Sequence, residues 1–126
     1  MREAVFCLIL ATSASAYACG YCVEDKIAAV YDHAAIERAL AERQTVVFFA
    51  IDGPLSASAN TRVRLQAIAD ATSGVIQGSA RVSVDAAALA VAYDPRRMTL
   101  AAVQRLLERR LAPYGLSLAV LRIVDK

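Results

Sequence analysis

The sequence predicts an α+β fold, a four-stranded antiparallel sheet with two helices on one face, preceded by an N-terminal helical extension. From residue 45 onward, the apolar pattern changes between strand and helix periods in the order βαββαβ. The residues just before 45 have a helical composition, rich in Ala, Glu and Arg. The chain has 126 residues, 58% hydrophobic and 21% charged, which suits one compact domain and excludes intrinsic disorder.

Residues 1–18 have the composition of a signal peptide. A short charged start is followed by an apolar run over residues 4–11, and Ala16-Tyr17-Ala18 offers small residues at the positions that a signal peptidase reads. We expect cleavage before Cys19 and a periplasmic or secreted mature protein. The alternatives are a buried N-terminal helix or strand and, with a poorer match at residues 16 and 17, a lipoprotein. The apolar run is too short to span a membrane.

Residues 19–44 are the predicted helical extension. No Gly or Pro occurs between Val23 and Arg43. In one unbroken helix, however, Ile36 would lie nearly opposite the apolar face that Val23 begins. We therefore predict two short helices with a break near Tyr31-Asp32-His33, the second capped by the Asp32 carboxylate.

The region 45–126 supplies the six elements of the sheet domain. Residues 45–51 form a β-branched and aromatic run typical of a central strand, and Asp52-Gly53-Pro54 ends it. Residues 99–111 are the clearest helix, with Thr99 as cap. The other predicted elements are a helix over residues 60–72 capped by Asn60 or Ser58, and strands over residues 75–84, 88–93 and 118–124.

Apolar spacing predicts which helix residues face the sheet. The helix over residues 99–111 presents Val103, Leu106, Leu107 and Leu111, and the helix over residues 60–72 carries Val63, Ala67, Ile68 and Ala71 at helical spacing. The expected strand partners are Val47 and Phe49, or their alternates Phe48 and Ile51, with Val82, Val84 and Val91.

The predicted order is the ferredoxin-like arrangement. Within it, residues 45–126, about two thirds of the chain, resemble the heavy-metal-associated (HMA) domain of copper chaperones and metal-transporting ATPases. The resemblance rests on Gly74-Val75, Ala80-Arg81-Val82-Ser83-Val84, Leu89-Ala90-Val91-Ala92-Tyr93 running into Asp94-Pro95, and a helix followed by Tyr114-Gly115-Leu116. The resemblance implies binding of a soft metal, usually copper(I), by a CxxC motif in the loop after the first strand.

That loop lacks the family's cysteines. Over residues 52–60 it has Ser56 and Ala59 at about the positions of the two thiols. Hydroxyls are weak ligands for a soft d¹⁰ ion, so the family's own site is not carried over. The chain has a CxxC earlier instead, in Cys19-Gly20-Tyr21-Cys22. We infer that the metal site has been relocated to the extension.

The relocated CxxC contains both cysteines of the expected mature chain, because Cys7 lies in the predicted signal peptide. A soft-metal site, a small disulfide and a redox dithiol are the three interpretations. A disulfide there would close almost no loop and stabilise the fold little. A redox motif of the thioredoxin type would need a preceding strand. Copper(I) is satisfied by two sulfurs, whereas zinc requires four ligands, and a helix beginning at Val23 would favour the thiolate of Cys22.

His33 is the only histidine and the candidate for a third ligand. In an unbroken helix it would lie ~16 Å from Cys22, so it can contribute only if the chain turns back near Asp32. The alternative is a surface or capping histidine beside Asp32.

Other classes of function have less support. A net charge of +2 and a pI near 8.6 do not indicate nucleic acid or a membrane surface as partner. No Ser-His-Asp arrangement or phosphate-binding Gly-rich loop indicates an enzyme.

The sequence thus predicts an exported protein, not an enzyme, that binds or shuttles a soft metal, copper(I) first. Its ligands are Cys19 and Cys22, with His33 as a weak third, and its partners are the metal ion and another metal-handling protein. The alternatives are a periplasmic redox dithiol protein and a metal-free interaction module that uses the sheet face or an edge strand.

Overall fold

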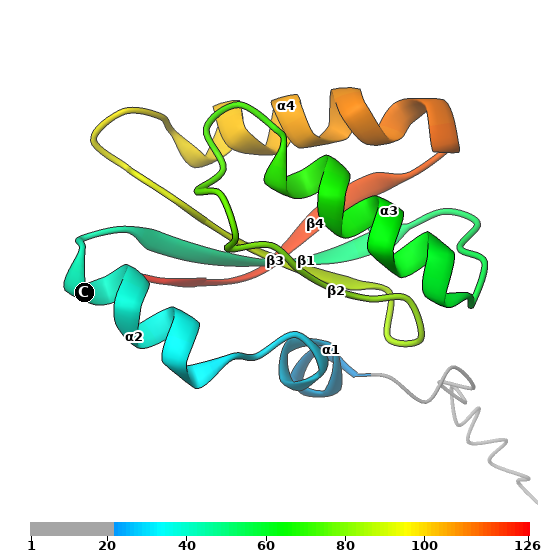
Figure 1. The fold of residues 1–126 in the computed structure, drawn as a ribbon, viewed down its shortest axis with the longest axis horizontal. Helices are drawn as coiled ribbons and strands as arrows, with labels where there is room; N and C mark the ends of the chain where they lie inside the picture. The colour runs from blue at the N-terminus through cyan, green and yellow to red at the C-terminus, as the bar shows by residue number, and fades with distance from the viewer. Residues whose placement is uncertain (1–21) are drawn as a thin grey trace, which may run out of the picture.

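A computed structural model describes residues 22–126, which form one antiparallel sheet between two helical layers (Figure 1). The sheet has the strand order β2-β3-β1-β4. From β1 onward, the elements follow the predicted βαββαβ order, and the ferredoxin-like fold class is confirmed. The elements are α1 (Val23–Ala29), α2 (His33–Ala41), β1 (Thr45–Asp52), α3 (Ala59–Asp70), β2 (Arg81–Ser83), β3 (Ala88–Tyr93), α4 (Leu100–Leu111), the 3₁₀ turn η1 (Ala112–Tyr114) and β4 (Ser117–Val124).

The two helical layers lie on opposite faces of the sheet. Figure 1 shows α3 and α4 together on one face, as predicted, and α1 and α2 on the other. The predicted break between α1 and α2 is confirmed, because Asp32 is the N-cap of α2 and its Oδ1 accepts from the Ala35 N–H at 3.0 Å. Among residues 22–126, no helix is long and apolar enough to cross a membrane.

Strand β1 is buried on both of its faces. Val47, Phe49 and Ile51 pack in the core under α3 and α4, whereas Val46 and Phe48 pack in a second core under α1 and α2. Phe48, one of the alternates expected beneath α4, therefore faces the opposite layer. A strand that is covered on both sides needs apolar residues at every position, which explains the continuous run in the sequence.

The two helices above the sheet differ in how well their faces were predicted. In α4, Val103, Leu107 and Leu111 are buried as expected, and Leu106 is half-buried. In α3 the buried residues are instead Leu65 and Ala69, while Val63 is 57% exposed and Ile68 is only partly buried. The alanines at 67 and 71 contribute little area, so Leu65, with Ile68 partly buried beside it, determines which face turns inward.

The strand predicted over residues 75–84 is wrong for its first part. Only Arg81–Ser83 form β2, and Val75 makes a single bridge to Tyr93. Gly74 and Gly78 have φ angles of +91° and +82°, which turn the chain out of a ladder. The Asp70 carboxylate then accepts from the N–H groups of Gly78 and Ala80, at 3.1 and 2.9 Å, so a side chain replaces the strand partner.

Candidate functional site

Cys22 lies at the start of α1, on the surface. It is the N-cap residue, with φ −81° and ψ 175°, and its thiol is exposed and forms no disulfide within residues 22–126. The Asp25 carboxylate, three residues later, accepts from the Cys22 backbone N–H at 3.3 Å and lies 3.2 Å from Sγ. The bond from the Cys22 N–H to the Asp25 carboxylate is one half of a capping box, and it fixes the backbone from which the thiol projects.

The other predicted ligand, Cys19, lies outside the described residues, so its distance from Cys22 is not defined here. Within residues 22–126, no group of three His, Cys, Asp or Glu side chains is placed to hold a metal ion. The predicted pair of thiolates therefore stays a prediction.

Helix α1 is held beneath the end of the sheet at which β1 ends. Lys26 Nζ donates to the carbonyl oxygens of Ala86 and Ala87, at 2.5 and 3.4 Å, in the turn between β2 and β3. The same Ala87 oxygen accepts from the N–H of Ile51, at 2.8 Å, next to the last residue of β1. Lys26 of α1 and the loop over residues 53–58 thus lie near the same end of the sheet, the end at which β1 ends.

The loop after β1 is built to start a helix and holds no thiol. Ser58 Oγ accepts from the Thr61 N–H at 3.2 Å as the N-cap of α3, which confirms one of the two predicted caps. The Ser58 N–H donates to the Ser56 carbonyl at 2.8 Å. This loop forms local turns, and its serine hydroxyls are poor soft-metal donors.

His33 is the first residue of α2 and is held by Tyr31. Its Nδ1 lies 3.5 Å from the Tyr31 hydroxyl, and the two rings stack with centroids 6.4 Å apart. The other neighbour of Tyr31 is Phe48, whose ring is nearly parallel at 6.5 Å. The histidine therefore belongs to an aromatic stack at the junction between α1 and α2.

The described residues do not bring His33 to Cys22. Near the start of α1, Glu24 pairs with Arg122 on β4, at one edge of the sheet. Beyond its other end, His33 and Arg81 line the same cavity of about 520 Å³ beside β2, at the opposite edge. Four strands separate these edges by about 14 Å. The chain does turn near Asp32, as the third-ligand hypothesis required, but the turn carries His33 away from Cys22.

Sequence reasoning missed Asp25, whose carboxylate contacts the Cys22 thiol. Its signal was present, because a capping residue followed three positions later by a carboxylate is a pattern typical of a helix start. Cysteine is an unusual member of that pattern, and the three interpretations of its thiol, a metal site, a disulfide and a redox dithiol, did not include a helix cap.

Two solved structures are similar to this chain. A copper binding domain from HMA7, a P-type ATPase, is 16% identical, with a TM-score of 0.49, over 63% of this chain and 96% of that one. Oxidised MerP from Ralstonia metallidurans CH34 is 15% identical, with a TM-score of 0.48, over 63% of this chain and 99% of that one. No family model and no curated protein matches the sequence.

Proposed function

We propose that the protein binds and shuttles a soft metal, copper(I) first, through the thiolates of Cys19 and Cys22. The observation that carries the proposal is the exposed position of Cys22 at the start of α1, the helix whose Lys26 is held at the end of the sheet where β1 ends. The HMA-like region suggested by the sequence would place its metal at the same end, in the loop after β1. The relocated CxxC would thus present a metal to partners at that end.

The donor set favours copper(I) over harder ions. Two thiolates at a CxxC spacing can converge on one ion, and two sulfurs satisfy copper(I). The thiol proton of Cys22, which faces the Asp25 carboxylate, would be released when the metal binds. Zinc would require two further ligands, and His33 is held at the other edge of the sheet.

Export is part of the proposal. Removal of residues 1–18 would leave Cys19 at the N-terminus, so that both thiols lie at the very start of the mature chain. Intact-mass measurement of the chain recovered from the periplasm or medium tests this. A mass that begins at Cys19 supports it, and a full-length mass there contradicts it.

Copper(I) titration of the reduced full chain against a competing chelator tests the metal site. We expect Cys19→Ser and Cys22→Ser each to weaken copper(I) binding by at least about 100-fold, because a single sulfur and a hydroxyl make a poor soft-metal site. Cys7→Ser and Ser56→Ala are the matched controls, one removing a thiol outside the motif and one altering the loop after β1. Both should bind as the unaltered chain does.

Two results would count against the metal site. One is an affinity equal to that of an isolated Cys-Gly-Tyr-Cys peptide, unchanged by either serine substitution. The other is weak copper(I) binding together with a disulfide that exchanges at a potential in the oxidoreductase range, which would favour the redox dithiol interpretation.

A further inference from the structure

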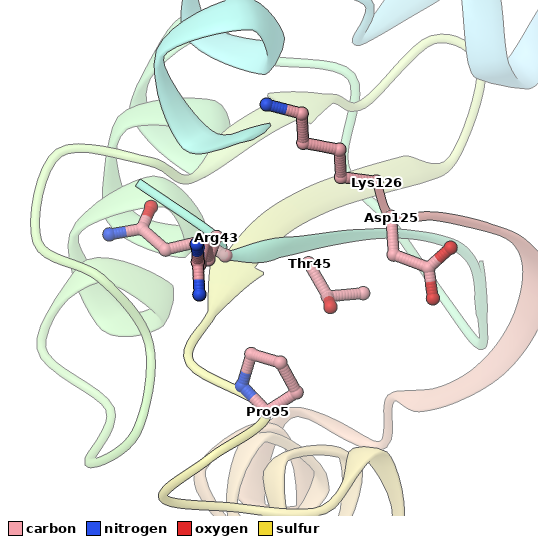
Figure 2. Close-up of a pocket in the computed structure, with 6 residues that line it drawn as sticks. Arg43, Thr45, Pro95, Asp125 and Lys126 are labelled. Carbon is pink, nitrogen blue, oxygen red and sulfur yellow. The ribbon is translucent and has the colours of Figure 1, made fainter. Parts of the chain in front are cut away.

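A second cavity, of about 470 Å³, lies at the end of the sheet where β1 begins, opposite the loop that follows β1. It is formed where α2 passes into β1, where β3 passes into the loop before α4, and where β4 ends (Figure 2). The proposed metal function uses none of it. The lining residues are Arg43, Gln44, Thr45, Pro95, Asp125 and Lys126.

Arg43 occupies a backbone position that normally belongs to glycine. Its φ is +59°, in the left-handed region. The Arg43 N–H donates to the Leu40 carbonyl at 3.1 Å and the Gln44 N–H to the Ala39 carbonyl at 2.8 Å, which is the Schellman pattern that ends a helix. A residue with a Cβ is strained at this position, whereas Gly adopts it freely. The chain thus keeps a guanidinium here against the local preference of the backbone.

The cavity presents opposite charges on its two sides. Figure 2 shows the Arg43 and Asp125 side chains on either side of Thr45, with the Pro95 ring below, whereas the Lys126 amine points away from Thr45 and Pro95. Thr45 is buried, and so is Tyr93, its partner across β1 and β3. Burial and, next, the charge of Asp125 raise the pKa of Tyr93.

We propose that this cavity binds a zwitterion, a free α-amino acid with an apolar side chain. Its carboxylate pairs with the Arg43 guanidinium, which suits planar anions, and its ammonium group pairs with Asp125. The side chain lies on the Pro95 ring. A ligand with only one of the two charges leaves either Arg43 or Asp125 without its partner.

Calorimetric titration of the full chain with L-leucine tests the proposal. Two analogues isolate the charges: 4-methylpentanoate lacks the ammonium group, and 3-methylbutylamine lacks the carboxylate. We expect leucine to bind and each analogue to bind at least about 10-fold more weakly, because a charge-assisted hydrogen bond is lost in each case.

The variant Arg43→Gly separates binding from folding. We expect it to weaken leucine binding at least about 10-fold and, at the same time, to raise the thermal midpoint, because glycine relieves the strained backbone. Asp125→Asn should weaken leucine binding by a similar factor. Arg105→Ala, on the exposed face of α4 and outside the cavity lining, is the matched loss of a positive charge and should leave leucine binding unchanged.

Three results would overturn the proposal. The first is no heat of binding with leucine, and the second is binding of 4-methylpentanoate as tight as that of leucine, which indicates an anion site. The third is a fall in both leucine binding and thermal midpoint in Arg43→Gly, which indicates that Arg43 supports the fold alone. None of these outcomes depends on copper(I) binding at Cys19 and Cys22.

Discussion

Asp32 is a single residue that joins two layers of the molecule. Its Oδ1 caps α2 through the Ala35 N–H, and its Oδ2 accepts from Arg81 Nε at 3.2 Å. Arg81 lies on β2 and also donates to the carbonyl oxygens of Gly78 and Ala80, at 2.8 and 2.9 Å. One carboxylate thus ties the junction between α1 and α2 to the edge of the sheet. The Ala35 N–H above all, and then Arg81, lower the pKa of Asp32 despite some loss of hydration.

The lowered pKa of Asp32 predicts a pH-dependent contribution to stability. A carboxylate whose pKa is lower in the folded state stabilises the fold above its unfolded pKa, near 3.9, and loses that contribution as the pH falls through the folded pKa. Asp32→Asn keeps a capping side chain but removes the charge. We expect this variant to be less stable than the unaltered chain at pH 7, with a difference that shrinks below about pH 4. Urea unfolding at pH 7 and pH 3 measures it, and a difference independent of pH would contradict the prediction.

At the scale of elements, the sequence was informative where structure is determined locally. The break between α1 and α2, the caps at Asp32, Ser58 and Thr99, and the inward face of α4 all follow from short-range spacing and capping chemistry. The strand prediction over residues 75–80 was wrong because Asp70, eight and ten residues earlier, accepts from the N–H groups of Gly78 and Ala80. Such a contact has no periodic signature in the sequence.

The second helical layer was predicted as helix but not as a cover for the sheet. Two signals were present in the strands. Residues 45–51 are apolar at successive positions, and the face of β3 toward α1 and α2 is made of Ala88, Ala90 and Ala92. Small side chains leave room for helices to approach closely. An alanine face beside a strand that is apolar on both faces therefore predicts a second helical layer. Of the candidate site, the sequence predicted Cys22 at a helix start, whereas the direction of the turn at His33 depends on this tertiary packing.

The two edge strands of the sheet determine how two copies of the molecule would pair. The edges are β2, with three residues, and β4, with eight. On β4, Val120 and Ile123 are 40% and 47% exposed, so this edge carries apolar side chains beside unpaired backbone groups. A long apolar edge strand is a template for pairing with another chain.

Two features of the fold protect the β4 edge. A register shift opposite Phe48 and Phe49 bends β4, and irregularities of this kind discourage further pairing. Helix α4 also covers the backbone of Leu118 with two side chains. Gln104 Nε2 donates to the Leu118 carbonyl at 3.0 Å, and the Leu118 N–H donates to Glu108 Oε1 at 3.2 Å. These side chains occupy the donor and acceptor that a neighbouring strand would use.

Removing this cover should make the molecule associate with itself. In the double variant Gln104→Leu and Glu108→Leu, the Leu118 N–H and carbonyl lose their partners, which should destabilise the monomer by roughly 1–3 kcal/mol. Pairing of β4 with β4 of a second copy would satisfy both groups and cover Val120 and Ile123, so the variant should associate at concentrations where the unaltered chain does not. Light scattering after gel filtration over a concentration series measures this.

Arg105→Leu adds an apolar side chain to the exposed face of α4 without uncovering Leu118, and it should behave as the unaltered chain. If Arg105→Leu associates as strongly as the double variant, the cause is surface hydrophobicity. If the double variant is destabilised but associates no more than the unaltered chain, the bend in β4 protects the edge by itself.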